Sequence, residues 1–433
     1  MVLGWRFDAH HDRKDAMNPR FQDAMHLATR LARNGQLAAS TEVIQRALGA
    51  ALPPAAGVQP TLHQEFDVSD PVTREGLPLA GLGRRLLGAL QAPPTWLEGL
   101  KSGELHLPGH SEPVSIPQVD REGTGESTFV WGSHNHGSLT RQYKLFVPPG
   151  NAGRSLPLVV MLHGCTQDPD DFAAGTDMNG LAVEHACAVL YPAQAQQANP
   201  SRCWNWFKHN HQGRGRGEAA CIASMTQAVM KAQAIDRDRV YIAGLSAGGA
   251  MAASVGAAYP DIFAAVGVHS GLAPGAARNL QEALMAMQGN VGGPVMRAAM
   301  PRPRGDAPSP GPVPMPLPVI VFHGDQDATV HPRNGERVVA AALGTVNQHS
   351  SPLHATRSPS QVVEGTAQGG RAYTRRIHEP EAGCPAAEHW IVHGAGHAWS
   401  GGRDAGSFTD PAGPDASREM LRFFLANPRR PGS

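Results

Sequence analysis

The fold is decided by one stretch, Arg239-Val240-Tyr241-Ile242-Ala243-Gly244-Leu245-Ser246-Ala247-Gly248-Gly249. A run of β-branched and aromatic residues leads into a Gly-x-Ser-x-Gly turn, and the small residues 250–254 that follow are compatible with a helix. The pattern therefore predicts a strand, a tight turn and a helix. In such a turn the serine backbone is strained, glycines stand where side chains would collide, and the hydroxyl is exposed above the sheet. Ser246 is the candidate nucleophile, and its strand and helix context argues against a chance match.

Short apolar runs recur on both sides of this stretch. We expect strands at residues 127–131, 143–148, 158–162, 188–191, 240–243, 264–268, 319–322 and 389–392, the first two as an antiparallel pair. Helical patterns lie at 168–186, 218–234, 248–258, 333–343 and 416–425. Runs that are apolar on both faces are typical of a buried parallel sheet. The alternation of strands and helices predicts an α/β fold with a mostly parallel central sheet and helices on both faces.

The 433 residues allow such a domain with an appendage. Apolar spacing in residues 1–50 predicts a small helical hairpin, and the proline-rich residues 51–125 predict a linker that is disordered in part. The catalytic domain is expected at 126–428.

Two insertions interrupt the predicted catalytic domain. The proline-rich residues 301–318 predict a surface loop. The polar residues 344–388 predict a surface excursion, with a lid as the alternative.

Charge and leader signals limit the function classes. Lys+Arg and Asp+Glu are balanced at 37 each, which argues against a polyanionic partner, so no nucleic-acid role is expected. Neither a signal peptide nor a transmembrane stretch is apparent, so we expect a cytoplasmic protein. Met17 opens a better-formed segment and is an alternative start.

Five cysteines spread through the chain do not form a disulfide framework, which fits a reducing compartment. One bridge between Cys165 and Cys203 stays open as an alternative, because both residues fall in loops expected at the same edge of the sheet.

A nucleophilic serine needs a base and a carboxylate that orients the base. Both residue types follow predicted strands farther along the chain, in the Ser, acid, His order associated with this turn. In the first loop we choose Asp327 over Asp325 because it lies deeper in the loop. In the second we choose His397 over His393, because flanking glycines let the loop carry His397 over the serine.

The same second loop raises the question of a metal. His393 and His397 are four residues apart, a spacing that aligns two ligands only on a helix. Gly394 and Gly396 argue against a helix there, so no metal is expected, and the sequence indicates no cofactor.

The oxyanion that forms on attack needs backbone N–H donors. We expect one from Ala247, which follows the nucleophile, and one from Cys165, in the loop after the first central strand. Trp204, Trp206 and Trp399 lie in loops near these residues, where they either line a hydrophobic cleft and bind substrate or anchor the core.

Four motifs together resemble the polyhydroxybutyrate (PHB) depolymerase family of esterases, in the α/β-hydrolase superfamily. They are Leu162-His163-Gly164-Cys165-Thr166-Gln167, Cys203-Trp204-Asn205-Trp206-Phe207, Gly244-Leu245-Ser246-Ala247-Gly248-Gly249 and Gly396-His397-Ala398-Trp399-Ser400-Gly401-Gly402. The resemblance covers about residues 126–426, and residues 17–48 look like the N-terminal extension of unexported members.

This resemblance implies catalytic roles for Ser246, Asp327 and His397, and an oxyanion hole at Cys165 and Ala247. It implies a serine esterase whose substrate is poly(3-hydroxybutyrate), its oligomers or a small ester. One alternative is a feruloyl or acetylxylan type of carbohydrate esterase, which shares the scaffold. Another is a non-catalytic protein of polymer granules. The N-terminal helices are a possible homodimer or granule contact.

Overall fold

The computed structural model describes residues 126–150, 154–289, 315–344, 358–380 and 386–429, together with Val43. The predicted N-terminal hairpin, the linker at 51–125 and most of the connector at 301–318 lie outside these residues. Among the described helices, none has the length and apolar character needed to cross a membrane.

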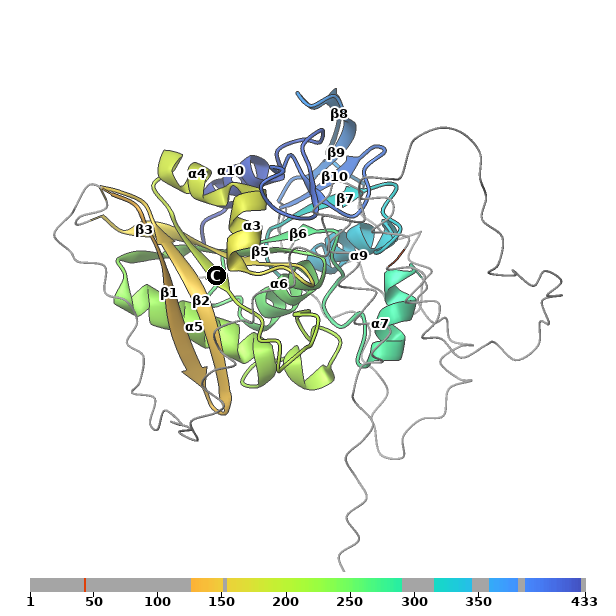
Figure 1. Cartoon of the computed structure of the whole chain (residues 1–433). Coiled ribbons are helices and arrows are strands. Elements are labelled where there is room, and N and C mark those ends of the chain that lie inside the picture. Colours follow the sequence, from red (N-terminus) through yellow and green to blue (C-terminus); the bar gives the residue numbers. More distant parts are fainter. Residues whose placement is uncertain are drawn as a thin grey trace, which may run out of the picture. The chain divides into compact units, whose positions relative to one another are not determined.

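The centre of the described part is a ten-stranded sheet (Figure 1). Its strand order is β1-β2-β4-β3-β5-β6-β7-β10-β9-β8. The strands are β1 (Thr128–His136), β2 (Leu139–Val147), β3 (Leu156–Leu162), β4 (Ala188–Pro192), β5 (Ile235–Leu245), β6 (Ala265–His269), β7 (Val319–Gly324), β8 (Gln361–Thr366), β9 (Ala372–His378) and β10 (Ala387–Val392). The strands from β4 to β10 in this order run parallel, while β1 and β2 at one edge and β9 and β8 at the other pair antiparallel. The parallel strands end together at one edge of the sheet, which is where sites form in folds of this kind.

Helices cover both faces of the sheet because its central strands are apolar on both sides. The helices are α3 (Pro169–Thr176), α4 (Met178–Glu184), α5 (Gly217–Ala232), α6 (Ala247–Ala258), α7 (Leu280–Met287), α9 (Arg333–Ala342) and α10 (Ala416–Ala426). Along β5, Val240 and Ile242 pack in one hydrophobic core with α5, α6 and α9, whereas Tyr241 and Ala243 pack in the other with α3, α4 and α10. Two short strands, β11 (Trp399–Ser400) and β12 (Thr409–Asp410), pair separately.

The predicted mostly parallel sheet with helices on both faces is confirmed, and it is an α/β-hydrolase fold. Two details of the prediction were wrong. The helix expected at 168–186 is two helices, because Asp177 has a left-handed backbone (φ 51°) that ends α3 before α4 begins. The described part of the segment 344–388 is not a plain surface excursion, since β8 and β9 lie in it and extend the sheet beyond β10.

Candidate active site

Ser246 stands at the sharp turn between β5 and α6, where its φ is 58° and its ψ is −119°. Its backbone N–H donates to the carbonyl of His269 at 2.9 Å. A Cβ atom on Gly248 would lie 2.1 Å from the carbonyl oxygen of Leu162, and one on Gly244 would lie 2.4 Å from the carbonyl carbon of Gly248. The prediction that glycines are required on both sides of the serine is therefore confirmed, since any side chain there would overlap backbone atoms.

His397 and Asp327 form a buried pair beyond the ends of β10 and β7. His397 Nδ1 lies 2.8 Å from Asp327 Oδ2, which leaves Nε2 of the ring for another partner. The other carboxylate oxygen, Oδ1, accepts the backbone N–H groups of Thr329 and Val330 at 2.9 and 2.8 Å. These bonds fix both the carboxylate and the imidazole that it orients.

The charge on Asp327 is maintained by its neighbours. Burial alone raises the pKa of this carboxyl, but the charge of His397 and hydrogen bonds from His323 and His397 outweigh burial and hold the pKa below its usual range. His323 Nε2 lies 3.4 Å from Asp327 Oδ2 and 2.7 Å from the carbonyl oxygen of Val330. Asp327 is therefore an ionised acceptor that faces two histidines.

The two residues that were not chosen from these loops, Asp325 and His393, also pair with each other. His393 Nδ1 lies 2.9 Å from Asp325 Oδ2, in a pair whose side chains are 42% and 34% exposed. Neither residue lines the cavity that contains Ser246 and His397. The structure thus brings Ser246 and His397 to one cavity, with Asp327 behind the histidine, and leaves the rival pair outside it.

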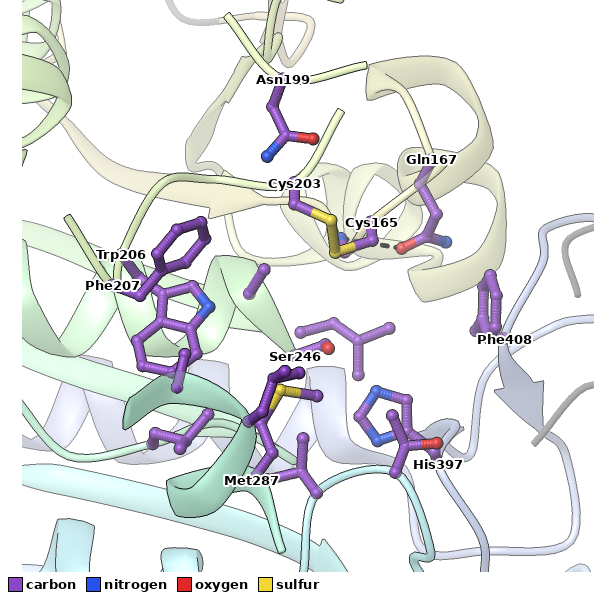
Figure 2. A pocket seen from close by; sticks show the side chains of 18 of the residues that line it. Cys165, Gln167, Asn199, Cys203, Trp206, Phe207, Ser246, Met287, His397 and Phe408 are labelled. Atoms are coloured by element: carbon purple, nitrogen blue, oxygen red, sulfur yellow. Dashed lines mark hydrogen bonds between the residues drawn. A yellow bond between two sulfur atoms is a disulfide. The ribbon is translucent and has the colours of Figure 1, made fainter. Parts of the chain in front are cut away.

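That cavity is strongly apolar (Figure 2). Ser246, His397, Gln167, Asn199 and Thr329 are its polar side chains, and the remaining lining residues are Gly164, Cys165, Cys203, Trp206, Phe207, Leu245, Ala247, Leu272, Leu280, Ala283, Leu284, Met287, Val330 and Phe408. Helix α7 supplies four of these. Helix α7 was not predicted from the sequence, although Asn279 as its N-cap and the apolar spacing from Leu280 to Met287 are signals for it.

Both expected oxyanion donors, Cys165 and Ala247, line the cavity. The peptide between Gly164 and Cys165 is held through its carbonyl oxygen, 2.7 Å from His163 Nδ1. A trans peptide points its N–H opposite to its C=O, so this bond directs the Cys165 N–H away from His163. Burial lowers the pKa of His163 to about 4, and its Nε2 accepts the backbone N–H of Gln194 at 3.1 Å. The ring is therefore neutral near pH 7, with its proton on Nδ1.

Cys165 and Cys203 form a disulfide, so the bridge that the sequence left open is present. It joins the loop after β3 to the loop after β4. Of the other cysteines that the structure describes, Cys187 and Cys221 are free and buried.

The three tryptophans divide between the two predicted alternatives. Trp206 lines the cavity and supports the cleft interpretation. Trp204 is fully buried against His163, and Trp399 is buried against His269 with its Nε1 donating to Ser417 Oγ. The prediction that Trp204 and Trp399 bind substrate is wrong for this cavity, because both side chains point into the core.

Within the described ranges, no group of three or more His, Cys, Asp or Glu side chains is arranged to hold a metal ion.

Comparison with known proteins gives one family and several relatives. The family described as esterase PHB depolymerase matches residues 141–359. Poly(3-hydroxyalkanoate) depolymerase C of Paucimonas lemoignei is 31% identical over 268 residues, which are 61% of this chain and 60% of that protein. Probable acetylxylan esterase A of Aspergillus clavatus is 28% identical over 231 residues, 52% of this chain and 73% of the relative. Among solved structures, an acetyl xylan esterase from Aspergillus awamori covers 70% of this chain and 99% of its own, at 18% identity and a TM-score of 0.49. The chain thus spans less than two thirds of the bacterial depolymerase that it matches.

Proposed function

The chain belongs to the esterase PHB depolymerase family, and on that premise we propose that it is a serine esterase that hydrolyses poly(3-hydroxybutyrate) or its oligomers. The observation that carries the proposal is the convergence of Ser246 and His397 on one apolar cavity, with the buried Asp327 bonded to the far nitrogen of the histidine. A serine hydroxyl that opens into the same cavity as a base with a fixed tautomer is the arrangement that acyl transfer requires.

In the proposed reaction, Ser246 Oγ attacks the ester carbonyl while His397 Nε2 takes the serine proton. The negative charge on the carbonyl oxygen is stabilised by the N–H groups of Cys165 and Ala247. The C–O bond to the alcohol then breaks, and His397 returns the proton to the leaving oxygen, which leaves an acyl group on Ser246. Water attacks this ester in the same way, releases the acid and restores the serine. Asp327 keeps the imidazole in its tautomer and stabilises the imidazolium.

The lining of the cavity favours a polyester over a sugar ester. Side chains from α7, together with Trp206, Phe207 and Phe408, form apolar walls. Such walls can pack against the methyl-bearing hydroxyacyl units of the polyester. A carbohydrate needs many hydrogen-bond partners, and only a few polar side chains line this cavity. The relatives named as acetylxylan esterases nevertheless keep carbohydrate-ester hydrolysis as the second candidate.

The test is the loss of turbidity of an amorphous poly(3-hydroxybutyrate) suspension, with Ser246→Ala as the control. Clearing by the wild type alone supports polymer hydrolysis through this serine. If soluble p-nitrophenyl butyrate is hydrolysed but the suspension stays turbid, the substrate is an oligomer or another ester. Release of acetate from acetylated xylan would then select the carbohydrate alternative.

A fluorophosphonate probe separates the enzyme from a non-catalytic granule protein. We expect covalent labelling of the wild type and none of Ser246→Ala. If the folded wild type resists the probe and hydrolyses no ester, the proposed function is wrong.

A further inference from the structure

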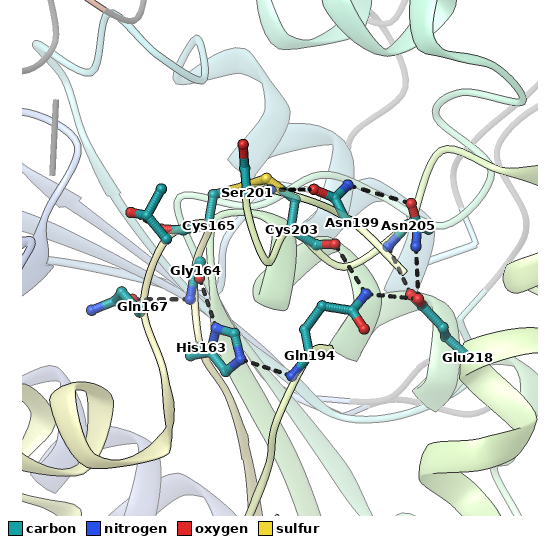
Figure 3. Close-up of a disulfide and its surroundings, with 11 residues drawn as sticks. His163, Gly164, Cys165, Gln167, Gln194, Asn199, Ser201, Cys203, Asn205 and Glu218 are labelled. Carbon is teal, nitrogen blue, oxygen red and sulfur yellow. Dashed lines mark hydrogen bonds between the residues drawn. A yellow bond between two sulfur atoms is a disulfide. The ribbon is translucent and has the colours of Figure 1, made fainter. Parts of the chain in front are cut away.

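Glu218 is a buried carboxylate that the proposed reaction does not use. It lies in the first turn of α5 with its side chain fully buried, and it does not line the cavity. Its Oε1 accepts Gln194 Nε2 at 2.6 Å, Asn205 Nδ2 at 2.7 Å and Arg141 Nη2 at 3.4 Å. Its Oε2 accepts the backbone N–H of Asn205 at 2.7 Å (Figure 3). A buried charge is stable only when it is satisfied in this way, so these donors are held firmly in place.

Two of these donors hold the loop between β4 and α5. Asn205, bound through both its backbone and its side chain, stands next to Trp206, which lines the cavity. Gln194 Nε2 also donates to the carbonyl oxygen of Cys203 at 3.0 Å, so Glu218 fixes the half of the disulfide that this loop carries. The loop is thereby held directly on both sides of the disulfide.

Gln194 also connects Glu218 with the loop after β3. The backbone N–H of Gln194 donates to His163 Nε2, and His163 Nδ1 donates to the carbonyl oxygen of Gly164 (Figure 3). That carbonyl sets the direction of the Cys165 N–H, because the peptide is planar and trans. A hydrogen-bonded path therefore runs from Glu218 to the expected oxyanion donor, in addition to the path through the disulfide.

We propose that Glu218 is a positioning residue for ester hydrolysis, which sets the direction of the Cys165 N–H through Gln194 while its bonds to Asn205 hold the loop that carries Cys203. The inference rests on the proposed function, in which the Cys165 N–H binds the oxyanion. Both carboxylate oxygens are needed as acceptors, because a glutamine of the same shape has one accepting oxygen and presents an NH₂ group to surrounding donors.

The first experiment compares Glu218→Gln with the wild type, using Glu364→Gln as the matched control, since Glu364 is an exposed glutamate on β8. The readouts are kcat and KM for p-nitrophenyl butyrate and the inhibition constant of an alkyl boronic acid, which forms a tetrahedral adduct with the serine. For Glu218→Gln we expect kcat to fall about tenfold, which is less than the ~100-fold cost of losing an oxyanion donor outright. The inhibition constant of the boronic acid should rise by about the same factor. KM should change by less than about twofold, because only the tetrahedral state uses the donor.

An unchanged kcat and boronate affinity in a folded Glu218→Gln protein would overturn the inference. So would equal losses in Glu364→Gln, or a loss confined to KM. These outcomes differ from failure of the proposed function, in which the wild type itself neither hydrolyses the ester nor reacts with the probe.

If Glu218→Gln does not fold, the variant Gln194→Met tests the same proposal. It keeps the backbone N–H that binds His163 and removes the side-chain bonds to Glu218, to the carbonyl of Cys203 and from the backbone N–H of Ala195. We expect kcat and the affinity for the boronic acid to fall together by about threefold. This loss of transition-state stabilisation is smaller than the one expected for Glu218→Gln. Wild-type values in this variant would likewise contradict the proposal.

Discussion

The nucleophile turn at 244–249 and the paired loops at 163–167 and 194–207 both build the candidate site, but they are held in different ways. The turn is shaped by close backbone contact, with glycines where Cβ atoms would overlap the turn itself or the end of β3, and with a serine at a positive φ. The paired loops are held by contacts between residues distant in sequence: a disulfide, the hydrogen bonds of two glutamines and a buried glutamate. The turn is therefore specified by a few adjacent residues, whereas the paired loops depend on partners that only the fold brings together.

Gly248→Ala tests the nucleophile turn with the largest expected effect. The new Cβ would lie 2.1 Å from the carbonyl oxygen of Leu162, a backbone atom that cannot move aside. We expect a loss of more than about 4 kcal/mol in the free energy of unfolding, measured by urea denaturation with tryptophan fluorescence. The control is Gly213→Ala, where nothing lies within 4 Å of the added atom. Similar losses in both variants would show that the turn is not specified by close backbone contact.

Removal of the disulfide tests the paired loops. The double variant Cys165→Ser, Cys203→Ser opens a covalent loop with a sequence separation of 38 residues. We expect the free energy of unfolding to fall by about 2–4 kcal/mol, since the unfolded chain gains the entropy of the opened loop. The turnover of p-nitrophenyl butyrate should also fall, because the Cys165 N–H loses its tether. Wild type reduced before measurement should match the variant, and full activity in both would mean that side-chain bonds alone hold the loops.

Acid should weaken the paired loops through His163. Its pKa lies at about 4 in the folded protein against 6.5 for the ordinary imidazole, so the unfolded chain binds more protons below pH 6.5. Its contribution to stability is complete above that pH and is lost progressively as the pH falls toward 4. At pH 5 the loss from this group is about 2 kcal/mol.

The measurement is urea unfolding at pH 7 and pH 5. His163→Gln should lose less stability between these pH values than the wild type does, by about that amount. His185→Gln, at an exposed site, should behave as the wild type does. If His163→Gln loses as much free energy of unfolding between pH 7 and pH 5 as the wild type does, the ring is not buried in its neutral form.

Ser246→Gly should give the smallest effect and the opposite sign. A positive φ at a residue with a side chain costs about 1–3 kcal/mol, which glycine relieves and alanine does not. We expect Ser246→Gly to be more stable than Ser246→Ala by about 1 kcal/mol in thermal unfolding, with both variants inactive. At Ser224, inside α5, the same pair of substitutions should rank in the reverse order, since glycine is unfavourable in a helix. If glycine and alanine rank in the same order of stability at both sites, the backbone of Ser246 is not strained.

The contrast between the two regions also explains what could be predicted from sequence. The central strands were predictable because burial on both faces leaves unbroken apolar runs. Asp327 and His397 could be proposed as partners because they follow such strands, and the structure pairs their side chains. The hairpin of β8 and β9 was missed because β8 is largely exposed, β9 is only half-buried and neither strand keeps a hydrophobic period.

The assignment of individual side chains was less accurate. The sequence placed Trp204 and Trp399 in loops near the site, but a position in a loop does not reveal whether a side chain faces the cleft or the core. Glu218 escaped notice for a related reason, because its partners Gln194 and Asn205 form no local motif with it.

The disulfide also has a consequence for the preparation of this protein. A sample that is oxidised only in part contains two molecules of the same sequence, which differ by two hydrogen atoms and by the covalent closure of a loop beside the site. Their average turnover number would then depend on the host strain, the lysis buffer and the age of the sample. A thiol titration on each batch, performed in denaturant because Cys187 and Cys221 are buried, makes specific activities comparable between preparations.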